Sequence, residues 1–311
     1  MRIFFVLGLL AATTVAAGAQ DIAVPAPPGE LHGTLLKAGD NGPAVLIIAG
    51  SGPTDRDGNS SLNVRASTYR LLAEGLAASG ISSLRYDKRG VGESKAALSS
   101  ETDLRIQTYA NDAGAMAAAL RRQTGAKCVW VLGHSEGALL AEMMAQHAEG
   151  ICGLILVSGS GRKAADLLRG QMQTALPPQM QPAPLSTLSE LEKGRIVLNP
   201  PQAAAVLFRE SVQPYMISWF REDPVTLLAA IRLPVLILQG DNDLQISVAD
   251  AKLLAAAKPD ATLVILPGVN HVLKAAPADR AGNMATYADP GLPLAPGVVD
   301  RIAAFVHEHS R

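Results

Sequence analysis

The sequence contains only two cysteines, Cys128 and Cys152, and no group of cysteines and histidines with the spacing of a metal site. It also has almost no net charge, because 27 basic residues stand against 28 acidic ones and leave −1. This balance gives no electrostatic reason to expect a nucleic acid or a strongly charged partner. No internal repeat is found, so a repeat architecture is not expected.

The sequence is rich in the residues that form a globular core. Of the 311 residues, 48% are hydrophobic and 18% are charged. This composition indicates a folded rather than a disordered chain. The length is enough for one large domain or two small ones.

The first 19 residues have the pattern of a secretory signal peptide. A basic start at Arg2 precedes an apolar stretch from Ile3 to about Val15, and the small residues Ala17-Gly18-Ala19 follow. We expect cleavage after Ala19. A membrane anchor is the alternative, but the apolar stretch is short for a span and no charged stop follows it. No cysteine stands at the cleavage site to carry a lipid. The protein is therefore expected to be periplasmic or secreted, with no stable membrane span.

Export places the two cysteines in oxidising conditions. Cys128 and Cys152 each stand at the start of a predicted strand, and the two strands are expected to be neighbours. A disulfide between them is possible. Two buried thiols that act as small hydrophobic residues are the alternative, since side-chain directions cannot be read from the sequence.

Beyond the leader, the pattern predicts a single α/β domain over residues 20–311. Apolar runs of strand length alternate with helical patterns, which predicts a mostly parallel sheet with helices on both faces. Two weaker stretches, 21–27 and 30–37, could form an antiparallel hairpin at its edge. The predicted buried strands are 44–49, 81–86, 128–133, 151–158, 234–240 and 261–267. The predicted helices are 65–79, 104–123, 137–148, 247–257 and 296–309.

Residues 162–225 interrupt this alternation, because they separate two strands without containing one. An insertion of this length in a compact domain is typical of a functional lid. Its Met and aromatic residues could line a substrate pocket, since Met adapts to varied apolar shapes. Ordinary packing of the lid is equally compatible with them. The candidates are Met172, Met180, Tyr215, Trp219 and Phe220.

A predicted strand runs directly into "GHSEG" (133–137), and a helical pattern follows. This matches the G-x-S-x-G nucleophile elbow in its strand–turn–helix setting. The turn is so tight that side chains at Gly133 and Gly137 would collide with the neighbouring strand and helix. Ser135 is thereby exposed at a helix N-terminus, which favours developing negative charge. The alternative is an ordinary strand–helix turn.

A serine nucleophile needs a base, and the base needs an orienting acid. Of the six histidines, only His271 in "GVNH" is expected in a loop just after a strand. The acid should lie between Ser135 and His271 and follow another strand. "LQGDNDLQIS" offers Asp241 and Asp243. We predict Asp243 as the acid and expect Asp241 to make backbone hydrogen bonds.

An oxyanion hole should combine the backbone N–H of Glu136 with one from the glycine-rich loop 49–61. We predict Ser51 as the second donor and expect Gly50 to approach the substrate. The alternative is a glycine-rich turn with no catalytic role.

Several charged residues near these stretches are expected to be structural. Asp55, Arg56 and Asp57 are expected to hold the glycine-rich loop through a charge network. Asp87, Lys88 and Arg89 are expected to form a structural turn. The Glu136 side chain is expected to pair with an arginine, or else to bind a substrate cation.

Together, "GHSEG", "LQGDNDLQIS", "GVNH" and "LRYDKRGVGES" (84–94) resemble the α/β-hydrolase superfamily over residues 30–310. With "AGSGPTDRDGN" (49–59), the chain is similar to bacterial esterases related to the serine aminopeptidase-like hydrolases. The resemblance implies the same Ser135, Asp243 and His271. One departure is that Ala49-Gly50 stands where many relatives have His-Gly, which affects the identity of the oxyanion donor.

The predicted function is an exported serine hydrolase that cleaves carboxylic esters of small to medium acyl groups and requires no metal or organic cofactor. A small-molecule ester is the expected partner. An amide or peptide hydrolase with the same residues is the first alternative, with Glu136, Glu190 and Glu192 as candidates for an acidic subsite. A non-catalytic binding protein on this fold is the second.

Overall fold

The computed structural model describes residues 18–147, 149–202 and 205–310. The expected signal peptide, residues 1–19, therefore lies almost entirely outside the described residues. The first strand begins at Ala19. No helix among the described residues is long and apolar enough to cross a membrane.

An eight-stranded sheet forms the centre of the domain, in the order β1-β2-β6-β3-β7-β8-β9-β10. The hairpin β1–β2 is antiparallel and pairs antiparallel with β6, whereas every other pairing in this sheet is parallel. The expected mostly parallel sheet with an antiparallel edge hairpin is thus confirmed. The strands are β1 (Ala19–Ala26), β2 (Gly29–Leu36), β3 (Ala44–Ile48), β6 (Ser82–Tyr86), β7 (Val129–His134), β8 (Ile151–Val157), β9 (Val235–Gly240) and β10 (Thr262–Leu266).

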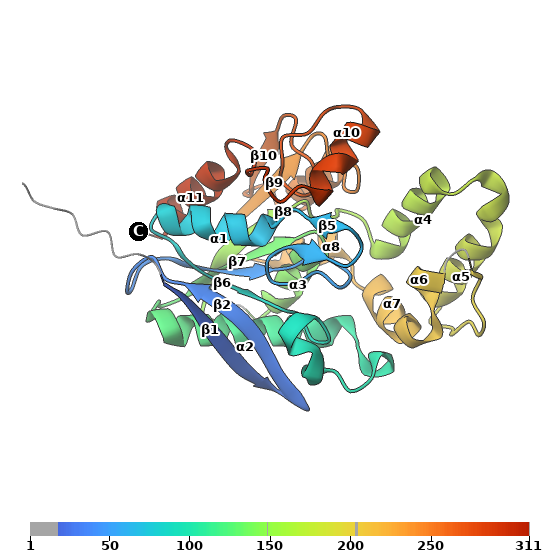
Figure 1. Cartoon of the computed structure of the whole chain (residues 1–311), viewed down its shortest axis with the longest axis horizontal. Helices are drawn as coiled ribbons and strands as arrows, with labels where there is room; N and C mark the ends of the chain where they lie inside the picture. Colours follow the sequence, from blue (N-terminus) through green and yellow to red (C-terminus); the bar gives the residue numbers. More distant parts are fainter. Residues whose placement is uncertain (1–17, 148, 203–204, 311) are drawn as a thin grey trace, which may run out of the picture.

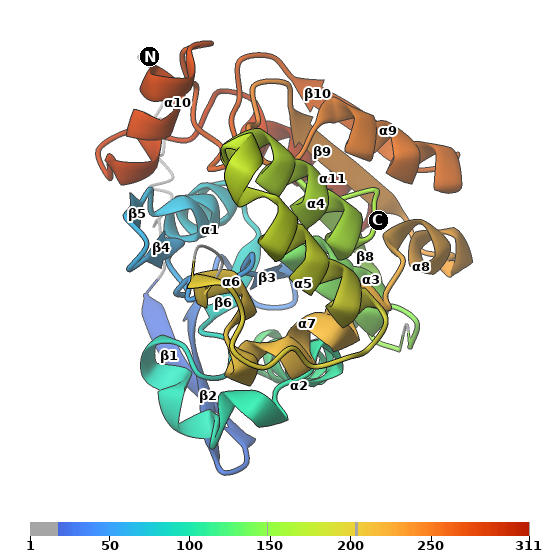
Figure 2. The same cartoon turned by 90° about the vertical axis from the view of Figure 1, so that its right-hand side faces the viewer.

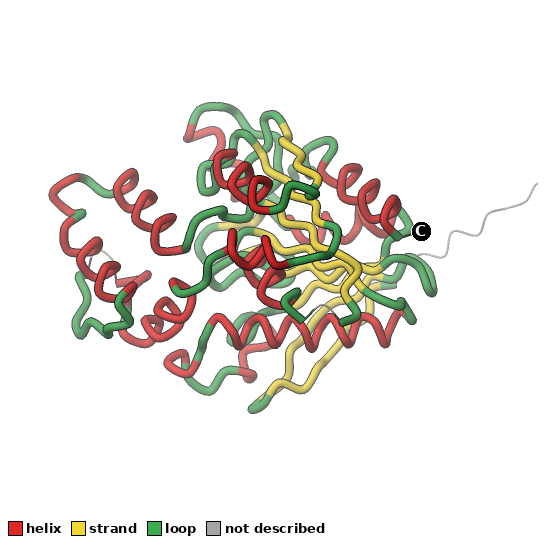
Figure 3. The backbone as a smooth tube through the Cα atoms, turned by 180° about the vertical axis from the view of Figure 1, so that it is seen from behind, coloured by secondary structure: helices red, strands yellow, loops and turns green. Residues whose placement is uncertain are grey.

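Helices cover both faces of the sheet (Figures 1 and 3). Alternate residues of one strand point to opposite faces, so Leu46 and Ile47 of β3 enter two different apolar cores. Residues of α1 and α11 pack in one of these cores, and residues of α2, α3 and α9 pack in the other. The covering helices are α1 (Thr68–Ala78), α2 (Ile106–Thr124), α3 (Glu136–Met144), α9 (Val248–Ala257) and α11 (Val298–His309).

The segment between β8 and β9 contains helices and no strand among its described residues. Helices α4 to α7 extend from one end of the sheet in Figure 1, and α4 and α5 lie in front of the strand ends in Figure 2. This segment corresponds to the insertion expected at 162–225, although its last helix continues to Ala230. The helices are α4 (Ala164–Ala175), α5 (Pro182–Glu192), α6 (Ala205–Phe208), α7 (Gln213–Phe220) and α8 (Pro224–Ala230).

Several short elements were not predicted, because two to six residues are too few to show a period. A two-stranded sheet of β4 (Asn59–Ser60) and β5 (Val64–Arg65) lies within and just after the glycine-rich loop, and α10 (Arg280–Ala285) follows the loop that carries His271. The 3-10 turns are η1 (Gly92–Ala97), η2 (Glu101–Asp103), η3 (Pro178–Met180), η5 (Glu210–Val212) and η6 (Thr286–Ala288).

The two cysteines form a disulfide in this structure, at the amino ends of the neighbouring strands β7 and β8. The bond closes a loop with a sequence separation of 24 residues, which contains the whole of the nucleophile turn. A crosslink of this kind stabilises the fold mainly by restricting the unfolded chain.

We expect the double variant C128A/C152A to lose about 2–4 kcal/mol of unfolding free energy, as is usual for a loop of this size. Urea denaturation of the wild type and of the variant, each with and without dithiothreitol, measures this loss. Dithiothreitol should lower the stability of the wild type only. Equal stability of the oxidised and reduced wild type would contradict the expectation.

Candidate active site

Ser135 stands at the point where strand β7 becomes helix α3. Its backbone angles are φ 57° and ψ −120°, which a residue with a side chain rarely adopts. The Ser135 N–H donates a 2.9 Å hydrogen bond to the Val157 carbonyl at the end of β8. The side chain is half-buried at the carboxyl edge of the sheet. The strained turn expected at this serine is therefore present.

The two glycines of the turn are required by close backbone contacts. A Cβ atom at Gly133 would lie 2.0 Å from the Gly137 carbonyl oxygen, and one at Gly137 would lie 2.4 Å from the Ile48 carbonyl oxygen. Both distances are far below van der Waals contact, so neither position accepts a side chain without backbone movement. The expected collision is confirmed, and its partners are α3 itself and the end of β3.

His271 and Asp243 meet at the same edge, in the loops that follow β10 and β9. The His271 Nδ1 atom lies 2.8 Å from Asp243 Oδ2, and both side chains are buried. Burial alone would raise the pKa of the Asp243 carboxyl. The charge and hydrogen bond of His271, together with the backbone N–H groups of Ile246 and Gln245, outweigh burial and lower that pKa. Asp243 is therefore a carboxylate at neutral pH.

Asp241 has a different partner from Asp243. Its Oδ1 atom accepts a 2.7 Å hydrogen bond from the Gly268 N–H, which ties the β9 loop to the β10 loop. The two neighbouring aspartates thus differ as expected: Asp243 faces the histidine and Asp241 bonds to backbone.

A hydrogen-bond chain joins the glycine-rich loop to the histidine loop. The Gly50 N–H donates to the Tyr69 hydroxyl at 2.9 Å, and that oxygen lies 2.9 Å from His134 Nδ1. The His134 Nε2 atom lies 2.8 Å from the His271 carbonyl oxygen, which can only accept. His134 Nε2 must therefore carry the proton, and Tyr69 donates to Nδ1.

His134 is neutral in this position. Burial, followed in size by the nearby charge of His271, lowers the pKa of His134 to about 3. A neutral ring with one donor and one acceptor is the form that the two hydrogen bonds of His134 require. Tyr69 and His134 were not predicted as parts of the site, because their meeting depends on tertiary contact between residues 65 apart in the sequence.

The glycine-rich loop passes directly beside Ser135. A Cβ atom on Gly50 would lie 3.2 Å from Ser135 Cβ. Gly50 is buried, whereas Ser51 is exposed. Among the described residues, neither the Ser51 N–H nor the Glu136 N–H has a hydrogen-bond acceptor. The Glu136 N–H follows Ser135 directly in the chain and the Ser51 N–H follows Gly50, so each is a backbone donor without a partner in the described protein.

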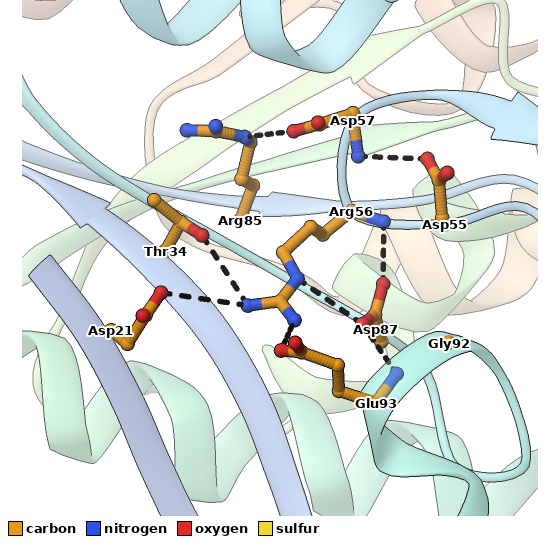
Figure 4. Close-up of a pocket in the computed structure, with 9 residues that line it drawn as sticks. All are labelled: Asp21, Thr34, Asp55, Arg56, Asp57, Arg85, Asp87, Gly92 and Glu93. Carbon is orange, nitrogen blue, oxygen red and sulfur yellow. Dashed lines mark hydrogen bonds and ion pairs between the residues drawn. The ribbon is translucent and has the colours of Figure 1, made fainter. Parts of the chain in front are cut away.

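Charged side chains hold this loop against β6, as expected (Figure 4). The Arg56 guanidinium bonds to Asp87 Oδ2 at 3.1 Å, and the Arg56 N–H bonds to Asp87 Oδ1 at 2.7 Å. Asp57 pairs with Arg85 of β6 at 2.8 Å. Asp55 accepts bonds from two backbone N–H groups within the loop. Figure 4 shows the Arg56 head group surrounded by acidic residues of several segments.

The Glu136 side chain pairs with a lysine and not with an arginine as expected. Its Oε1 atom lies 2.8 Å from Lys88 Nζ, and both side chains are almost fully buried, at 2% and 1% exposure. Lys88 comes from the turn after β6, 48 residues earlier in the chain. This carboxylate is therefore not free to bind a substrate cation.

A small cavity of about 30 Å³ lies beside Ser135. Helices α4, α7 and α8 of the insertion contribute to its walls. Of the residues predicted to contact the substrate, Trp219 lines this cavity and Gly50 lies beside Ser135. Met172 and Met180 do not line it: Met172 packs in the main apolar core and Met180 is exposed. The lining residues are Ser135, Glu136, Leu139, Ser160, Arg162, Ala164, Leu167, Trp219, Pro224 and Ile246.

The remaining candidates of the insertion have other surroundings. Tyr215 and Phe220 are buried in the apolar core. Glu190 pairs with Lys193 and Arg195, and Glu192 pairs with Arg169. No group of three or more His, Cys, Asp or Glu side chains that could hold a metal ion occurs within the described ranges.

Comparison with known proteins gives a consistent picture. The sequence pattern of the family described as "Serine aminopeptidase, S33" matches residues 62–275. Esterase EstD of Thermotoga maritima is 25% identical over 258 residues, which are 82% of this chain. The chain spans about 60% of the length of that curated relative.

Solved esterase structures share the fold. Est1E from Butyrivibrio proteoclasticus, in a structure with bound ferulic acid, matches with a TM-score of 0.60 and 17% identity over 93% of this chain and 97% of that chain. The Pyrococcus furiosus esterase Pf2001 matches with a TM-score of 0.58 and 16% identity over 97% of this chain and 95% of that chain. At these identities, the likeness shows the fold alone.

We expect Tyr69→Phe to lower the unfolding free energy by roughly 2 kcal/mol or more, because it leaves the buried Gly50 N–H and His134 Nδ1 without partners. Tyr86→Phe is the matched control, since the Tyr86 hydroxyl is buried and has no hydrogen-bond partner in the described structure. Urea denaturation of the two variants measures the difference. A loss of similar size in both variants would show that the hydrogen bonds of Tyr69 contribute nothing to the free energy of unfolding.

Proposed function

The chain belongs to the serine aminopeptidase S33 family of α/β-hydrolases, and on this basis we propose that it is a serine hydrolase of carboxylic esters. The observation that carries the proposal is the strained turn at Ser135 at the sheet edge where the His271–Asp243 pair also lies. A turn of this kind is retained where a serine oxygen must be presented to a substrate. The esterase names of the relatives support the same reaction class.

In the proposed mechanism, Ser135 is the nucleophile and His271 is the general base. Asp243 occupies the Nδ1 side of the His271 ring, so Nε2 is the nitrogen left to accept the Ser135 proton. Asp243 fixes this tautomer and stabilises the imidazolium that forms. The low pKa of Asp243 means that its charge is present throughout the neutral range.

The ester carbonyl oxygen becomes negatively charged when Ser135 attacks the carbonyl carbon. The N–H groups of Ser51 and Glu136 are the proposed donors to this oxyanion, and their lack of acceptors among the described residues supports that role. His271 then returns the proton to the leaving alcohol, and an acyl-enzyme remains on Ser135. Water, activated in the same way, attacks the acyl-enzyme and releases the acid.

The cavity beside Ser135 is proposed to hold the acyl group. Leu139, Leu167 and Trp219 give it apolar walls. Its small volume argues against long acyl groups, and its lining by the insertion supports a lid role for residues 162–225.

The charges of the insertion favour an ester over an aminoacyl substrate. An aminopeptidase needs a free acidic group for the substrate ammonium, but Glu136 is paired with Lys88. Glu190 and Glu192 are paired with basic side chains as well. No described candidate for that subsite is therefore left unpaired.

We expect the mature protein to hydrolyse p-nitrophenyl esters, fastest with short to medium acyl chains. Ser135→Ala should abolish turnover, because no other group can form the acyl-enzyme. Initial rates on esters from acetate to palmitate measure both effects. No turnover on any ester, together with turnover of aminoacyl amides, would show that the protein hydrolyses amides instead of esters.

The controls use neighbouring residues of the same type. Ser158→Ala changes a buried serine that also has positive φ, at the end of the adjacent strand, and should leave turnover within a few-fold. Asp243→Asn should lower turnover by about 10⁴-fold through the wrong histidine tautomer. Asp241→Asn keeps an oxygen acceptor for the Gly268 N–H and should have little effect.

Failure of a fluorophosphonate to label Ser135 would favour a binding protein.

We also propose that the protein is exported and acts in the periplasm or outside the cell. The pattern of residues 1–19 and the disulfide between Cys128 and Cys152 support this location. Expression of the full chain in a Gram-negative host should give a periplasmic protein that begins at Gln20. N-terminal sequencing of the fractions measures this, and an uncleaved chain in the cytosol would contradict it.

A further inference from the structure

Lys88 is a buried cation beside the active site that the proposed mechanism does not use. Its side chain is 1% exposed, at the carboxyl end of β6. The Nζ atom donates to the Gly50 carbonyl oxygen at 2.6 Å and to Glu136 Oε1 at 2.8 Å. It also lies 4.8 Å from the centre of the Tyr109 ring. A lysine is rarely buried to this extent unless its ammonium group has specific partners.

The first partner fixes the direction of a peptide. The Gly50 carbonyl and the Ser51 N–H belong to one peptide unit, which is trans. In a trans peptide the C=O and N–H groups point in opposite directions. A lysine that holds the Gly50 oxygen therefore directs the Ser51 N–H away from itself.

The second partner belongs to the other side of the oxyanion hole. Glu136 is the first residue of α3, and its own N–H has no acceptor among the described residues. One ammonium group thus bonds to the Gly50 carbonyl, whose peptide carries the Ser51 N–H, and to the side chain of Glu136, the residue after Ser135. The Gly50 N–H is held in turn by Tyr69, so side chains fix both ends of Gly50.

We propose that Lys88 is a positioning residue that sets and polarises the Ser51 N–H as an oxyanion donor. An ammonium group on the carbonyl oxygen draws electron density from the peptide and strengthens its N–H as a donor. Glu136 balances the buried charge, which would otherwise be strongly unfavourable. The inference rests on the proposed ester hydrolysis.

The catalytic test compares Lys88→Met with the double variant K88M/E136Q. Lys88→Met should lower kcat at least 10-fold with KM changed less than threefold, because the donor acts mainly in the transition state. Inhibition by a trifluoromethyl ketone, which forms a tetrahedral oxyanion on serine, should weaken by the same factor as kcat/KM. K88M/E136Q removes the uncompensated carboxylate and should recover part of the lost Tm without recovering kcat.

Lys258→Met is the matched control for the loss of a buried lysine. Lys258 Nζ also bonds to one backbone carbonyl, that of Ile231, and to one carboxylate, that of Asp260. It lies just before β10, at the sheet edge opposite Ser135. Lys258→Met should lower Tm and leave kcat of the folded enzyme unchanged. Recovery of kcat together with Tm in K88M/E136Q would overturn the proposal.

A substrate-free measurement separates this inference from the proposed function. The ¹⁵N resonance of the Ser51 amide reports the hydrogen bond to the preceding carbonyl, so it should shift in Lys88→Met and not in Lys258→Met. An unshifted resonance would overturn the proposal whatever the activity. A shifted resonance in a protein that hydrolyses no ester would leave Lys88 orienting this peptide and refute only the ester reaction.

Discussion

The close approach of helix α3 to strands β7 and β3 is the constraint on which the site depends. Backbone atoms fill the space where side chains at Gly133 and Gly137 would stand. This contact forces Ser135 into its rare backbone conformation and leaves the Glu136 N–H at the beginning of a helix. It also brings the end of β3, and therefore Gly50, against the serine. The nucleophile and the nearby donors are consequences of one packing arrangement.

The loops around Ser135 make few hydrogen bonds of the sheet type. Their backbone groups are bound instead by side chains from distant elements. Tyr69 and Lys88 bind opposite ends of the Gly50 residue, and His134 connects Tyr69 to the backbone of His271. Each of these groups is buried, so the loss of one partner would leave another polar atom with neither a protein nor a water molecule to bond to. This arrangement makes the site rigid without adding any regular secondary structure to it.

The sequence was sufficient to predict the sheet, its edge hairpin and the helices on both faces. It was also sufficient to place Ser135, Asp243 and His271 after three strands of one sheet, since each follows an apolar run of strand length. The prediction that the strand before His271 is buried was wrong, because β10 is an edge strand in which only Leu266 is buried. The pairing of Glu136 with Lys88, and of Tyr69 with His134, could not be predicted. These partners lie 48 and 65 residues apart, and local patterns carry no information about such contacts. The same limit explains why Met172 and Met180 were assigned to a pocket that they do not line.

The disulfide has a mechanical consequence for the strand pair that carries the nucleophile. Cys128 and Cys152 join β7 and β8 at their amino ends, whereas Ser135 stands beyond the carboxyl end of β7. A β-strand rises about 3.3 Å per residue, so roughly 20 Å separates the crosslink from the serine. These strands cannot begin to separate at the crosslinked end, and any partial opening of the pair starts at the catalytic edge. The crosslink and the buried hydrogen bonds around Ser135 thus restrain opposite ends of the same strand pair.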